Sequence, residues 1–69
     1  MPDRLIAAVR RVSHAKELVA RQRARTEILK ANRLPTGEAE ALLKTYIRTL
    51  ALFKEQERDL REALRTQKN

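Results

Sequence analysis

The chain has 69 residues, a formal net charge of +7 and no cysteine, so it allows one small domain and excludes a disulfide framework or a zinc–cysteine site. Hydrophobic residues make up 42% of the chain, but ten of them are Ala, so a deep globular core is not expected. One Gly and two Pro supply too little turn material for a β-fold, whereas 36% charged residues with abundant Ala and Leu favour long helices.

A first helix is predicted over residues 3–31, because no Gly or Pro interrupts this segment and Pro2 and Asp3 suit a helix start. Small and branched apolar residues recur along it at the alternating three-and-four spacing of a coiled-coil seam. The predicted seam of this helix consists of Leu5, Ala8, Val12, Ala15, Val19, Gln22, Thr26 and Leu29.

A turn is predicted over residues 32–36, because Pro35 cannot continue a helix and biases the residue before it toward extended geometry. Asn32 is expected to close the first helix in the left-handed conformation. Thr36 is the expected N-cap of the next helix, with Glu38 and Glu40 in its first turn, where the helix dipole favours negative charge.

A second helix is predicted over residues 37–66, and the short turn before it forces an antiparallel neighbour. Its seam consists of Ala39, Leu43, Tyr46, Leu50, Phe53, Glu57, Leu60 and Leu64. Folding the chain at the turn places small residues opposite large ones, for example Ala15 opposite Phe53. The sequence therefore predicts an all-α, antiparallel two-helix coiled-coil hairpin.

Polar residues interrupt the predicted seam at Gln22, Thr26 and Glu57. The Gln22 amide is expected to bond to the Tyr46 hydroxyl or to water, because buried polar groups nearly always find partners. Glu57 is expected to reach solvent, Arg11 or Arg61. We interpret its carboxylate as structural, because a catalytic carboxylate needs a second group poised beside it.

Further apolar residues flank the seam and form a candidate oligomer interface, which consists of Val9, Leu18, Leu42 and Ile47. The flanks lack charge complementarity: Lys16 faces Lys54, and Lys30 opposite Glu40 is the exception. A homodimer that forms a four-helix bundle is the most economical way to bury this surface. A different protein partner would satisfy it equally, and a monomer with scattered exposed aliphatic residues is the remaining alternative.

The residues give little support to catalysis, and neither a cofactor nor a metal site is expected. His14 is the single His and lies off the seam without companion ligands. Ser13 beside it cannot form a nucleophile–base pair, because consecutive helical residues point about 100° apart. Gly37 is the single Gly, so a glycine-rich phosphate loop is absent from the sequence. A non-enzymatic protein is predicted.

Residues 1–33 carry nine basic and three acidic residues, so most of the positive charge lies in the first helix. The cluster Arg21, Arg23 and Arg25 is a candidate contact for phosphate or for an acidic partner. These residues are two apart and fan around the helix, and stacking aromatics are missing beside them. Nucleic-acid binding is therefore the alternative reading, ranked below protein–protein association. Membrane binding ranks lower still, because the apolar face is used internally.

Two stretches, Ala15–Arg23 with its Val-Ala-Arg-Gln-Arg run and Thr36–Leu43 with its Thr-x-x-Ala-x-x-Leu-Leu pattern, resemble a group of short proteobacterial proteins without an established activity. Relatives in that group often carry a Gly before the turn Thr, where this chain has Leu34 and Pro35. The resemblance implies a bacterial helical hairpin and no mechanism. Together these features predict a cytoplasmic, self-associating interaction or adaptor module, since neither a signal peptide nor a transmembrane run is recognisable.

Overall fold

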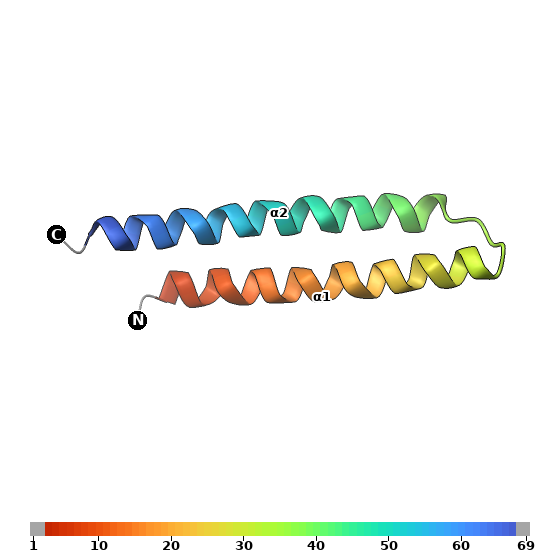
Figure 1. Ribbon diagram of the computed structural model, residues 1–69, viewed down its shortest axis with the longest axis horizontal. Helices are drawn as coiled ribbons and strands as arrows, with labels where there is room; N and C mark the ends of the chain where they lie inside the picture. The colour runs from red at the N-terminus through yellow and green to blue at the C-terminus, as the bar shows by residue number, and fades with distance from the viewer. Residues whose placement is uncertain (1–2, 68–69) are drawn as a thin grey trace.

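The computed structural model describes residues 3–67 and consists of two helices, α1 (Asp3–Ala31) and α2 (Gly37–Thr66). The helices run antiparallel and lie side by side, so the start of α1 and the end of α2 lie at the same end of the molecule (Figure 1). The Cα atoms span 58 × 16 × 12 Å. The predicted all-α antiparallel hairpin is confirmed. Pro2, which the sequence suggested as part of the helix start, lies outside the described residues.

Helix α1 turns its small residues inward and buries them against α2. Its buried residues are Leu5, Ala8, Val12, Ala15, Val19, Gln22 and Thr26, and the last seam residue, Leu29, is half-buried. Ala8 and Ala15 are only 1% and 2% exposed, because a methyl side chain lets the second helix approach closely enough to exclude water. The buried side of α1 is thus the seam that the heptad spacing predicts.

Helix α2 is covered much less completely than α1. None of its residues, Gly37–Thr66, is fully buried, and its seam residues are all half-buried. The two seams differ in side-chain size: the α2 seam carries Tyr46, Phe53 and Leu60, whereas the α1 seam includes Ala8 and Ala15, which offer little surface to cover them. A broad apolar ridge along α2 therefore keeps part of its surface in water.

The turn closes α1 through Arg33, whose φ of 56° places it in the left-handed region. The Arg33 amide donates to the Lys30 carbonyl at 3.0 Å and the Leu34 amide to the Leu29 carbonyl at 2.9 Å, which is the Schellman pattern of helix ends. The assignment of the left-handed position to Asn32 was wrong. Asn32 instead donates from its side-chain Nδ2 to the Ile28 carbonyl at 2.8 Å, because it lies one residue too early for the reversal.

Helix α2 begins at the expected position but without the expected side-chain cap. The Thr36 carbonyl accepts from the Glu40 amide at 2.8 Å, whereas the Thr36 hydroxyl makes no capping bond. Glu38 and Glu40 lie in the first turn, where their negative charges interact favourably with the helix dipole. The Glu40 carboxylate also lies 3.7 Å from Lys30 Nζ, so the predicted charge pair across the turn is present.

The two polar seam residues of α1 form hydrogen bonds within the hairpin. Gln22 Nε2 donates to the Ala39 carbonyl at 3.0 Å, and not to the Tyr46 hydroxyl that the sequence suggested. The Thr26 hydroxyl donates to the Gln22 carbonyl one turn earlier, at 2.8 Å. Among the described residues, no buried side-chain nitrogen or oxygen lacks a partner. The polar part of the seam is therefore internally satisfied.

Candidate functional site

The hairpin has two flanks, one on each side of the seam. Residues that follow Ala8, Ala15 or Gln22 in sequence turn to one side, whereas residues that precede Val12, Val19 or Thr26 turn to the other. The same rule holds on α2. Two grooves lined by both helices show which residues share a flank. Lys16 and Lys54 line a groove on one flank, and Arg25 and Leu42 line a groove on the other.

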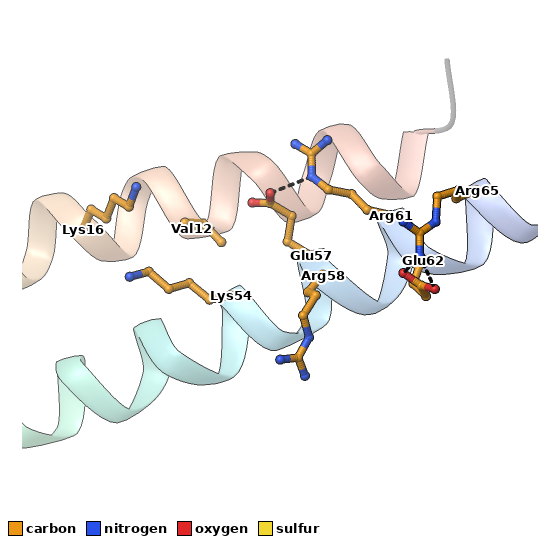
Figure 2. A pocket seen from close by; sticks show the side chains of 8 residues that line it. All are labelled: Val12, Lys16, Lys54, Glu57, Arg58, Arg61, Glu62 and Arg65. Atoms are coloured by element: carbon orange, nitrogen blue, oxygen red, sulfur yellow. Dashed lines mark hydrogen bonds and ion pairs between the residues drawn. The ribbon is translucent and has the colours of Figure 1, made fainter.

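The first flank, which we call the basic flank, contains a shallow groove of about 400 Å³ between the helices. Its lining residues are Val12, Lys16, Lys54, Glu57, Arg58, Arg61, Glu62 and Arg65. Figure 2 shows the Lys16 and Lys54 side chains extending from opposite helices into the space beside Val12. Two positive charges thus share one groove across the seam.

The carboxylates of this groove are occupied by arginines of their own helix. Glu57 Oε2 accepts from Arg61 Nε at 2.8 Å, and Glu62 accepts from Arg65 at 2.6 Å (Figure 2). Arg61 was one of the partners expected for Glu57. In the part of the chain that the structure describes, no carboxylate lies within 4.0 Å of the Lys16 or Lys54 amine. Both amines are therefore available to an anion from outside.

The three candidate arginines are exposed but lie on different sides of α1. Arg23 lines a second groove of about 520 Å³ on the basic flank, together with Lys16. Arg25 lies on the opposite flank beside Leu42. Arg21 points farther away from the seam and is 3.7 Å from Glu17 one turn earlier. The three arginines therefore lie on different sides of α1, and only Arg23 shares a groove with Lys16.

The candidate interface residues are likewise divided between the two flanks. Val9 and Ile47 are 40% and 41% exposed. Each comes directly after a seam residue in the sequence, which places both on the basic flank. Leu42 is 41% exposed on the opposite flank, and Leu18 on that flank is half-buried. A single contact surface cannot contain all four residues, because the body of the hairpin separates them.

A row of uncharged residues that the sequence reasoning missed runs along α2 on the flank of Leu42. It consists of Leu42, Thr45, Thr49 and Leu52, and we call it the neutral stripe. The Thr45 and Thr49 hydroxyls donate to the Ala41 and Thr45 carbonyls at 3.2 and 3.0 Å, so both are bonded within the helix. Leu52 is 52% exposed. The signal was present in the sequence, since these residues repeat at three, four and three positions, which is a second seam spacing.

Other kinds of site find no support in the described residues. No group of three His, Asp or Glu residues there could hold a metal ion, and His14 is exposed on α1. Within residues 3–67, neither helix is long and apolar enough to cross a membrane.

Comparisons with protein-family models, curated proteins and solved structures gave no match to this chain. The proteobacterial resemblance noted from the sequence therefore stays an expectation.

Proposed function

We propose that this protein is a non-enzymatic helical module that associates with a second copy of itself through the neutral stripe of α2. The observation that carries the proposal is the incomplete cover of α2, all of whose seam residues remain half-exposed in the single hairpin. Burial of apolar area is the main favourable term in folding. A partner that packs on α2 would therefore add stabilisation, because α1 leaves part of the apolar surface of α2 exposed.

The neutral stripe favours a helix as the covering element. Its spacing presents Leu42 and Leu52 on one side of α2 with the threonine methyl groups between them. The threonine hydroxyls are already hydrogen-bonded to their own helix, so covering them leaves no unsatisfied donor. Packing on this stripe would also enclose more of the α2 ridge beside it.

Charge favours a second α2 over other elements of the chain as the occupant. The same flank of α1 carries exposed Arg11 and Arg25, which would be costly to place on an apolar row. Another neutral stripe brings no charge to the contact. A two-fold axis between two antiparallel α2 helices would pair the stripe with itself and give a four-helix assembly. Two-fold symmetry is the commonest symmetry of homo-oligomers.

Sedimentation equilibrium of matched variants tests this proposal. Wild type is expected to form a dimer in the micromolar range, and Leu42→Glu/Leu52→Glu is expected to be monomeric. Val9→Glu/Ile47→Glu is the control, because it introduces the same charges at similarly exposed positions on the basic flank, and it should remain dimeric. Monomeric wild type at millimolar concentration, or dissociation by the control alone, would contradict the proposal.

A further inference from the structure

We infer that the basic flank binds the phosphate backbone of duplex nucleic acid, with Lys16, Arg23 and Lys54 as the contacting residues. This activity is separate from self-association, because these residues lie on the flank opposite the neutral stripe. It also moves the candidate phosphate contact away from Arg21 and Arg25.

The first support is the uncompensated charge between the helices. Lys16 and Lys54 share one groove, and none of the described carboxylates lies within 4.0 Å of either amine. Opposite charges are close by, since Glu57 and Glu62 line the same groove, but arginines hold both of them. Like charges across a coiled-coil flank reduce stability, so an external anion would relieve the repulsion as it binds.

The second support is the straight, repeated placement of the cations. Lys16 and Arg23 are seven residues apart on one side of α1, which is about 10 Å along a helix with a rise of about 1.5 Å per residue. Duplex DNA carries closely spaced phosphates along its whole length. The two strands together carry one phosphate per about 1.7 Å of the axis, so two cations about 10 Å apart on a rigid rod can each contact a phosphate of the same duplex.

The third support concerns the type of nucleic acid. Neither groove of the basic flank is lined by an aromatic residue, and Tyr46 and Phe53 belong to the seam. Single strands are usually bound by stacking of bases on aromatic side chains. Backbone contacts by lysine and arginine carry no base information, so binding is expected to be independent of sequence.

Fluorescence anisotropy of a labelled DNA duplex, titrated with the protein at several salt concentrations, tests the inference. Binding to wild type should weaken with salt, by about 0.9 in log–log slope for each phosphate contacted. Lys16→Gln/Lys54→Gln should reduce the magnitude of the log–log slope by about 1.8, which corresponds to the loss of two phosphate contacts. The matched control Arg21→Gln/Arg25→Gln removes the same net charge on other faces of α1 and should leave the slope nearly unchanged.

A stability measurement separates lost binding from lost folding. Lys54→Glu is expected to replace a like-charge pair with a salt bridge to Lys16, and should raise the melting temperature by about 1–5 °C while it weakens duplex binding at least as much as Lys16→Gln/Lys54→Gln does. Opposite effects on stability and binding are not expected of a residue with a purely structural role.

Competition distinguishes the sources of negative charge. Unlabelled duplex should displace the labelled duplex at lower charge concentration than inorganic polyphosphate, and polyglutamate should be weaker than both. If the two double variants had equal slopes, the loss of net charge alone would explain the weaker binding, and the inference would be overturned. Absence of binding at low salt, or stronger competition by polyglutamate, would overturn it as well.

Discussion

Gln22 in α1 donates a hydrogen bond of 3.0 Å from its side-chain amide to the carbonyl oxygen of Ala39 in the first turn of α2. It is the one side-chain hydrogen bond between the helices in residues 3–67, and Gln22 itself is only 6% exposed. A polar group in an apolar seam has few alternative partners, so this bond favours one axial alignment of the two helices over neighbouring ones.

Removing this bond should weaken the hairpin without unfolding it. Gln22→Ala is expected to lower the free energy of unfolding by about 0.5–1.5 kcal/mol from the lost hydrogen bond, with a further loss of packing. Urea denaturation followed by far-UV circular dichroism measures the change. Gln56→Ala, at an exposed position of α2, should change stability by less than about 0.5 kcal/mol. Equal effects of the two substitutions would show that the bond contributes nothing.

The close approach of the helices at Ala15 gives a second prediction. Ala15→Leu should destabilise the hairpin by about 1–3 kcal/mol, because a larger side chain at a position only 2% exposed must push α2 away. Ala24→Leu makes the same change at an exposed position of α1 and should stay within about 0.5 kcal/mol of wild type. Tolerance of Leu at residue 15 would mean that the seam is not packed as described.

The left-handed backbone of Arg33 gives a third prediction, with the opposite sign. Arg33→Gly should stabilise the hairpin by about 1 kcal/mol, because Gly adopts a φ of 56° without the steric cost that an Arg side chain carries. Asn32→Gly should destabilise it, since the Nδ2 bond to the Ile28 carbonyl is lost and a positive φ is not needed there. Thermal denaturation of both variants gives the comparison, and a shift of both in the same direction would refute it.

The seam could be predicted from sequence because helix periodicity decides which residues share a side. Positions Ala8, Val12 and Ala15 are buried as the spacing requires. Details that depend on short-range geometry could not be predicted. The Gln22 side chain is long and flexible enough to have more than one candidate acceptor, and the two helix-closing bonds of the turn decide that residue 33, not residue 32, takes the left-handed conformation.

The candidate surfaces were predicted only in part. The facing of Lys16 and Lys54 follows from the register of the seam, and both line one groove. The split of the arginines was available in the sequence, since Arg23 follows Gln22 whereas Arg25 precedes Thr26 on the helix. The pairing of Glu57 with Arg61, which leaves the two lysines without a carboxylate, required side-chain positions.

Spin labels placed on α2 test most directly whether a second copy covers the neutral stripe. The chain has no cysteine, so Thr49→Cys and Ala51→Cys each provide one labelling site, on the stripe and on the opposite side of α2. If two α2 helices pack at an interaxial distance of about 8–10 Å, continuous-wave electron paramagnetic resonance should show much stronger dipolar broadening for labels at residue 49 than for labels at residue 51. Dilution with unlabelled chains should abolish the broadening. Absence of broadening for labels at residue 49, or stronger broadening at residue 51, would contradict the account.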